Sequence, residues 1–282
     1  MRKQVPVILM IFLIMLCVCI TAGWASEEMP NSARAMALGN AGSTLIGGYG
    51  EVLTYNPALL TSTRPGATIF YTNKYAIPGF DEQSISISFR TGKIYWGSMI
   101  IKDEAILLEE IQGETCENNW DNLKIGLGLS FNARDHLSLG CSFWSNIQDV
   151  SIAKDADNLS GKDNNFFASV GLNYNVKRVG LSAVIEGILN DFSQTKLAVR
   201  LGKPGSLVAL AEIKYEFGEQ RFNYYGGIES WIAPNFALRA GVDQAGMFTA
   251  GLGAGKGSLG FDYAYSLHPA GSTHYLSSSY SF

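Results

Sequence analysis

Short segments in which apolar and polar residues alternate recur along most of this chain, without helical patterns between them. In residues 123–131 every odd position is Leu, Ile or Phe, whereas the even positions are Lys, Gly and Ser. Residues 259–267 alternate in the same way, with Leu, Phe and Tyr at the odd positions. A period of two residues is that of a β-strand with one apolar face.

We predict fourteen such strands from residue 67 to the end of the chain. Their predicted ranges are 67–76, 84–91, 94–102, 122–132, 137–149, 164–175, 179–189, 195–202, 206–217, 221–232, 236–243, 246–255, 258–267 and 272–282. The even-numbered connections are all short. The two long connections, 103–121 and 150–163, are the third and the fifth, as expected for a membrane barrel with short turns on one rim and longer loops on the other.

Two architectures fit this alternation, a soluble β-sandwich or barrel and a membrane β-barrel. Fourteen strands enclose a lumen too wide for apolar side chains to fill, which favours an apolar outer face and a polar inner face. Only 16% of the residues are charged, against about 25% in soluble domains. We therefore predict an all-β fold, a transmembrane antiparallel β-barrel of about 14 strands.

The polar face of the predicted barrel carries charged residues that would line a wet lumen, and we expect those in neighbouring strands to pair. Ordinary charge balance without a transport role is the preferred explanation of these charges, and a role in selectivity is the alternative. These residues are Lys124, Glu186, Lys196, Arg200, Glu212, Lys214, Arg239, Asp243 and Asp262.

The N-terminus has the layout of a secretory signal peptide. Arg2 and Lys3 precede an apolar run, Val5 to Ile20, and small residues surround Ala25. The run is shorter than the ~20 residues of a spanning helix. We therefore predict a cleaved leader at 1–25, an N-terminal plug or periplasmic segment at 26–66 and the barrel at 67–282, in the outer membrane of a Gram-negative-type bacterium.

The predicted plug is rich in Ala and Gly and shows no strand alternation. Asn56 and Pro57 can act as the N-cap and first residue of a brief helix. Glycine allows close packing or a positive φ. We expect Asn56 and Pro57 to help seal the lumen.

Two motifs in this segment resemble the N-terminal signature of the PorV/PorQ-like proteins, which are related to the FadL-like outer-membrane barrels. They consist of Met36, Gly39, Ala41 and Gly42, followed by Asn56, Pro57 and Ala58. The stretches "YYGGIESWIAPNFALRAGVD" and "GSLGFDYAYS" are similar to later strands of that family. The resemblance implies a 14-stranded outer-membrane barrel with its N-terminal segment tucked inside.

The same resemblance implies a role in type IX-like protein secretion or in transport across the outer membrane. The alternatives are a FadL-like channel for hydrophobic compounds and a non-conducting barrel that docks partner proteins. Expected partners are outer-membrane lipid, the barrel-insertion machinery and either secretion components or a hydrophobic small molecule. The net charge of −4 does not indicate the basic surface of a nucleic-acid-binding protein, so we expect no nucleic-acid partner.

Motifs for catalysis or cofactor binding are incomplete, so we predict no enzyme activity, cofactor or metal. "GLGAGKGS" at 251–258 departs from a phosphate loop and reads as a hairpin. "DADNLSGKD" at 155–163 lacks calcium-loop spacing. His136, His268 and His274 lack metal-ligand spacing. Ser266 or Ser272 near His274 would be the only imaginable hydrolase pair, in a region full of serines.

Two further features concern the cysteines and the C-terminus. Cys116 and Cys141 could pair in an oxidising compartment, although two separate thiols are the preferred interpretation. The chain ends on alternating aromatic residues, and Tyr280 and Phe282 resemble the signal that the barrel-insertion machinery reads. We expect the last strand to close the barrel against the first.

Overall fold

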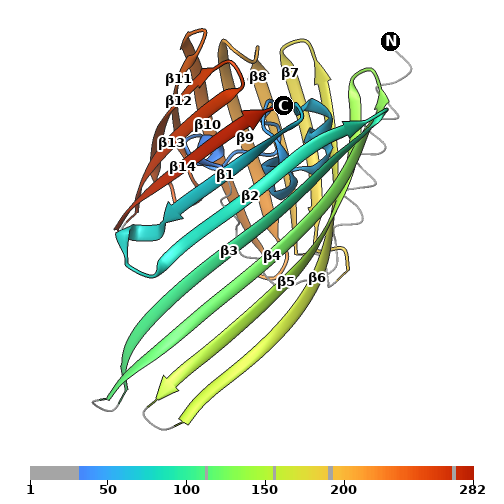
Figure 1. Cartoon of the computed structure of the whole chain (residues 1–282). Helices are drawn as coiled ribbons and strands as arrows, with labels where there is room; N and C mark the ends of the chain where they lie inside the picture. The colour runs from blue at the N-terminus through green and yellow to red at the C-terminus, as the bar shows by residue number, and fades with distance from the viewer. Residues whose placement is uncertain (1–31, 112–113, 155–156, 190–192, 269–270) are drawn as a thin grey trace.

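The computed structural model describes residues 32–111, 114–154, 157–189, 193–268 and 271–282, which form one closed antiparallel barrel (Figure 1). Each strand pairs with its neighbours in the sequence, and β14 pairs with β1. The predicted fold class is therefore confirmed. The strands are β1 (Gly66–Asn73), β2 (Phe80–Thr91), β3 (Ile94–Ile111), β4 (Glu114–Arg134), β5 (Leu137–Lys154), β6 (Asp157–Val176), β7 (Val179–Glu186), β8 (Gln194–Gly202), β9 (Leu207–Glu216), β10 (Arg221–Ala233), β11 (Phe236–Val242), β12 (Phe248–Lys256), β13 (Leu259–His268) and β14 (Gly271–Ser281).

The outer face of the barrel carries large apolar side chains that stay exposed. Ile69, Leu127, Tyr224 and Leu267 are examples from four separate strands, each 59–64% exposed. Alternate positions on the same strands point inward and are buried. An outward apolar band with a polar interior is the arrangement of transmembrane barrels. Among the described residues, no helix has the length and apolar character to cross a membrane.

The two rims of the barrel differ. The even-numbered connections, such as 92–93 and 257–258, are short and lie together on what we call the short-turn rim. The C-terminus lies there too, since the backbone N–H of Phe282 donates to the carbonyl of Pro65 at 3.1 Å and that of Ser281 to Ser258 at 2.8 Å. The even-numbered connections are therefore the short ones, as predicted. The last strand closes the barrel against the first, also as predicted.

The prediction of long loops at 103–121 and 150–163 is wrong. Strands β3 to β6 continue through both ranges and form a wall of four strands that rises beyond the opposite rim (Figure 1). Glu109 pairs with Cys116, and Ser151 with Ser160, within the ranges predicted as loops. Backbone hydrogen bonds to the neighbouring strands sustain this wall. Its sequence lacks regular apolar alternation, so the pattern gave no strand signal.

Residues 32–65 lie inside the barrel, near the short-turn rim (Figure 1). They contain the helix α2 (Ala33–Met36) and the 3₁₀ helices η1 (Gly50–Thr54) and η2 (Pro57–Ser62). A further 3₁₀ turn, η3 (Lys74–Ala76), joins β1 to β2 at the opposite rim. We call residues 32–65 the plug. The predicted brief helix after Asn56 is present as η2, and the Asn56 side chain accepts from the backbone of Ala58 at 2.9 Å.

The register of the strands separates the two cysteines. Glu117, which follows Cys116, pairs with Ala153, twelve positions along β5 from Cys141 (153 − 141). Twelve strand residues span about 40 Å, and this separation of the two backbone positions is too large for a disulfide. Cys141 is a free thiol. The stretch 251–258 runs from β12 into a turn and is a hairpin, as predicted.

Candidate functional site

Asn56 holds two parts of the plug against the barrel wall. Its side chain is fully buried, and its Nδ2 donates to the carbonyl of Ser43 at 3.1 Å and to that of Leu172 on β6 at 3.2 Å. Its Oδ1 caps η2. A single side-chain amide thus forms hydrogen bonds with the barrel wall, with the loop at Ser43 and with the first turn of η2. Asn56 therefore fixes the position of the plug relative to β6.

Glycines on the inner wall let the plug approach the strands closely. A Cβ at Gly171 would lie 2.0 Å from Oδ1 of Asn56, and one at Gly140 would lie 2.5 Å from the backbone N of Ala58. A Cβ at Gly128 would lie 2.2 Å from the side chain of Leu53. The plug therefore fits the β3–β6 side of the wall without a gap.

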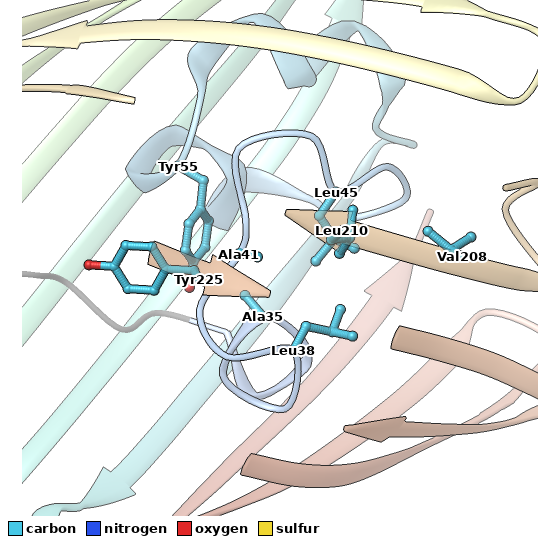
Figure 2. Close-up of a cluster of buried hydrophobic side chains, with 8 residues drawn as sticks. All are labelled: Ala35, Leu38, Ala41, Leu45, Tyr55, Val208, Leu210 and Tyr225. Carbon is cyan, nitrogen blue, oxygen red and sulfur yellow. The ribbon is translucent and has the colours of Figure 1, made fainter. Parts of the chain in front are cut away.

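The motif residues before Asn56 pack the plug against strands β9 to β14 and β1. Leu38, Ala41, Leu45 and Tyr55 of the plug form one buried cluster with side chains of β9 and β10, among them Tyr225 (Figure 2).

Three further motif residues of the plug, Met36, Gly39 and Gly42, are also closely packed. Met36 belongs to a second buried cluster with Phe70 and Tyr275. Gly39 has φ +68° and donates to the Thr249 hydroxyl at 3.0 Å, and a Cβ there would lie 2.2 Å from the carbonyl of Val242. Gly42 lies against the ring of Tyr55.

An ion-pair network joins the plug to the wall. Arg34 of α2 contacts both carboxylate oxygens of Glu229 at 2.8 Å. Arg239 also contacts Glu229 at 2.8 Å and reaches Asp262 at 2.6 Å. Burial alone would lower the pKa of Arg34, but the attraction of Glu229 and the hydrogen bond to it raise the pKa overall. The network fastens the first helix of the plug to β10, β11 and β13.

All but one of the predicted lumen charges lie on the inner face of the barrel. Asp243 is the exception, because it follows β11 and its carboxylate accepts from the backbone of Ala245 and Met247 at 2.9 Å, which orders the turn there. The inward residues are Lys124, Glu186, Lys196, Arg200, Glu212, Lys214, Arg239 and Asp262.

Several of these charges pair along the wall. Lys196 contacts Glu186 at 2.8 Å, and Lys214 contacts Glu216 at 2.6 Å with its side chain fully buried. Glu212 instead accepts from the backbone N–H of Ser43 in the plug at 2.9 Å. These strands therefore present a polar face to the lumen, and one of their carboxylates anchors the plug.

The opposite inner face, on β3 to β6, is apolar where it meets the plug. The Trp144 and Phe167 rings stack with centroids 5.9 Å apart and planes 7° apart. Trp144 packs in one cluster with Met99 and Ile101 of β3 and with apolar plug residues such as Leu53. Phe167 is only half-buried. The lumen thus has an apolar strip that ends on the plug.

The whole barrel is similar to solved structures of two bacterial toluene transporters and of a bacterial FadL homologue. The toluene transporter TbuX of Ralstonia pickettii aligns with a TM-score of 0.64 at 11% identity, over 88% of this chain and 97% of that chain. The toluene transporter TodX of P. putida aligns at 0.66 and 12% identity, over 91% and 99%. A FadL homologue from Pseudomonas aeruginosa aligns at 0.65 and 10% identity, over 93% and 100%.

The shared feature is the fold. No family model matches the sequence, and no curated protein is significantly similar to it. The fourteen-stranded barrel is therefore of the type seen in the FadL homologue. The resemblance of its motifs to PorV/PorQ-like proteins stays a prediction.

The other chemical motifs considered in the sequence do not come together. The Nδ1 of His274 lies 2.8 Å from the hydroxyl of Tyr263, so its contact is a tyrosine and not a serine. Ser266 lies on the buried inner face of β13. The range 155–163 enters β6 at Asp157. Within the described ranges, no group of three or more His, Cys, Asp or Glu residues could hold a metal.

Three residues of the site were not predicted from the sequence. Arg34, Glu229 and Glu51 anchor the plug. A signal for the first two was present, because Arg34 is a lone cation in an Ala-rich segment and Glu229 interrupts an aromatic strand. Their pairing joins positions 195 residues apart and depends on the closure of the barrel.

Proposed function

We propose that this protein is an outer-membrane channel for small apolar molecules, with residues 32–65 as its plug. The apolar strip of Trp144 and Phe167 carries the proposal, because it presents two stacked aromatic rings where the lumen meets the plug. Aromatic faces bind apolar and aromatic solutes. The fold similarity to two toluene transporters supports the same conclusion.

The proposed orientation places the short-turn rim in the periplasm and the four-stranded wall outside the cell, as in other outer-membrane barrels. A solute would enter from the long-strand side, bind at Phe167 and reach the plug at Leu53. The plug packs without a gap on this side, so passage requires the plug to shift. We also propose that residues 1–25 are a leader that directs export of the chain and is then cleaved. These residues lie outside the part of the chain that the structure describes.

A matched pair of substitutions on β6 tests the channel. Phe167 borders the lumen, whereas its neighbour Phe166 is 57% exposed on the outer face. Phe167→Gln should slow the entry of labelled toluene into cells that carry the barrel, and Phe166→Leu should leave entry unchanged. Equal rates with both variants and with an empty vector would rule out the channel.

A docking or secretion role of the PorV/PorQ type is the second candidate. The wall of β3 to β6 favours it, since several strand residues beyond the apolar band form a surface outside the membrane (Figure 1). Replacing 107–118 with a two-residue Asn-Gly turn would shorten the wall and keep the pairing of Ile106 with Asn119. Loss of secreted proteins with unchanged toluene entry would favour docking over transport.

A further inference from the structure

A small cavity of about 180 Å³ lies between the plug and the wall, next to the short-turn rim. We call it the rim pocket. Its wall side combines small residues of β12, β13 and β14, among them Gly255 and Gly260, with the larger side chains of Trp231, Arg239 and Asp262. Its plug side includes Gly48 and Glu51. The small residues of the lining leave room for roughly six water molecules.

The rim pocket is closed toward the opposite rim. Ala33 and Met36 of the plug pack there against Phe70, Ala264 and Tyr275, which lie farther from the short turns. Whatever enters the pocket must therefore come from the short-turn side. The pocket is a dead end for permeation and has the form of a binding site.

Glu51 offers a carboxylate oxygen to this pocket. Glu51 is 7% exposed, and its Oε2 accepts from the backbone of Tyr49 at 2.9 Å and from the hydroxyls of Thr68 and Ser86 at 3.1 and 3.4 Å. Its Oε1 lies against Gly48, another residue of the pocket lining, where a Cβ would come within 2.8 Å. The hydrogen bonds from Tyr49, Thr68 and Ser86 all end on Oε2, which leaves Oε1 as the oxygen best placed to accept from a bound group.

The charges around the pocket favour a cation. Arg34 and Arg239 are both engaged by Glu229, and Arg239 also holds one oxygen of Asp262. These two positive groups face three carboxylates when Glu51 is ionised. The side chain of Asp262 is 22% exposed and lines the pocket beside Trp231, whose ring can support a cation.

We propose that the rim pocket binds a primary ammonium group that enters from the short-turn side, with Oε1 of Glu51 and the carboxylate of Asp262 as its acceptors. A metal ion fits less well, since the described residues supply no cluster of three metal-binding side chains and two arginines stand nearby. The bound ammonium bridges the plug to β13. Its binding therefore holds the plug in place.

The ammonium group has two possible sources. One is a free small amine. The other is the amino group of the chain itself after removal of residues 1–25, which would begin six residues before Ser32 (32 − 26), a residue of the pocket. Both sources use the same acceptors, so one set of variants tests the chemistry and a second separates the sources.

The test is calorimetric titration of the purified mature barrel in detergent at pH 8 with 1,4-diaminobutane, and with 1-butanol as the uncharged comparison. We expect saturable binding of the diamine alone. Glu51→Gln and Asp262→Asn should each weaken it about tenfold or more, because each removes a charged acceptor. Gly255→Leu should abolish binding by filling the pocket, where a Cβ meets its nearest atom only at 3.4 Å.

Ala250→Leu, on the same strand, has an exposed side chain on the outer face and serves as the control for Gly255→Leu. Binding that appears only when residues 26–31 are removed would assign the pocket to the chain's own amino group. No binding by either form overturns the proposal. Binding that survives Glu51→Gln, Asp262→Asn and Gly255→Leu overturns it as well.

Discussion

Arg34 and Glu229 form a two-pronged ion pair that spans the inside of the barrel, with Nε and a terminal guanidinium nitrogen each 2.8 Å from a carboxylate oxygen. The side chain of Glu229 is 1% exposed and that of Arg34 is 14% exposed. A planar guanidinium matches a carboxylate in this geometry better than an ammonium can. The pair therefore determines both the position and the rotation of α2 against β10.

Arg34→Ala should loosen the plug without preventing closure of the barrel. Glu229 would keep its contact with Arg239, so we expect a loss of about 2–3 kcal/mol in the free energy of unfolding. Planar lipid bilayers should show larger or noisier conductance. Arg34→Lys keeps the charge but loses one of the two hydrogen bonds to Glu229. Its stability and conductance should therefore lie between those of the wild type and the alanine variant. Identical conductance in all three proteins would show that the pair does not hold the plug.

Gly171→Ala should displace the plug, although it adds only a methyl group. The new Cβ would lie 2.0 Å from Oδ1 of Asn56, the atom that caps η2. We expect a cost of about 1–3 kcal/mol, typical of overpacking, together with faster proteolysis of the plug. Gly161→Ala is the matched control on the same strand, because no atom lies within 4 Å of a Cβ there. Equal proteolysis of the two variants would contradict the close fit.

The sequence predicted the barrel well because lipid imposes a period of two on every strand that crosses it. Strand β9 was predicted at 206–217 and lies at Leu207–Glu216. The same reasoning failed at 103–121, since apolar and polar residues do not alternate regularly there and the strands are sustained by backbone pairing. Alternation in β12 and β13 placed Asp262 on the inner face. It could not reveal that Arg239 would reach it, because that contact depends on how neighbouring strands align.

The plug was predicted only in outline for a related physical reason. Its helices are four to six residues long and are held by contacts with distant strands, so local patterns carry little signal. Asn56 was the exception, since an Asn-Pro pair is a local helix-start signal. The partner of Asn56 on β6, the carbonyl of Leu172, lies 116 residues away.

Removal of Tyr280, Ser281 and Phe282 should block assembly of the barrel. The truncation deletes the backbone donors that Ser281 and Phe282 supply to Ser258 and Pro65, and it exposes the edge of β1 at Gly66 and Ala67. An open edge in lipid leaves backbone groups without partners. Heat-modifiable migration on gels, together with membrane fractionation, should show an unfolded, unincorporated chain. Normal insertion of the truncated protein would remove the proposed assembly role.

The stability of the plug should depend on pH through Glu51. Burial raises the pKa of Glu51, partly offset by hydrogen bonds from Tyr49 and Thr68. The unfolded chain titrates near its ordinary pKa of about 4.3. The folded state therefore holds the proton more tightly, and this contribution is complete below about pH 4.3 and is lost as the pH rises through the folded pKa.

Glu51→Gln removes this titration and keeps a side chain of similar shape. The free energy of unfolding of the variant should therefore rise relative to the wild type as the pH increases above about 4.3, as measured by urea titration in detergent. Arg34, Arg239, Glu229 and Asp262 also face this region, but all four stay in both proteins and cancel in the comparison. Parallel pH profiles for the two proteins would mean that Glu51 titrates alike in the folded and unfolded chains, and its carboxylate would then not be the destabilised group that the rim pocket requires.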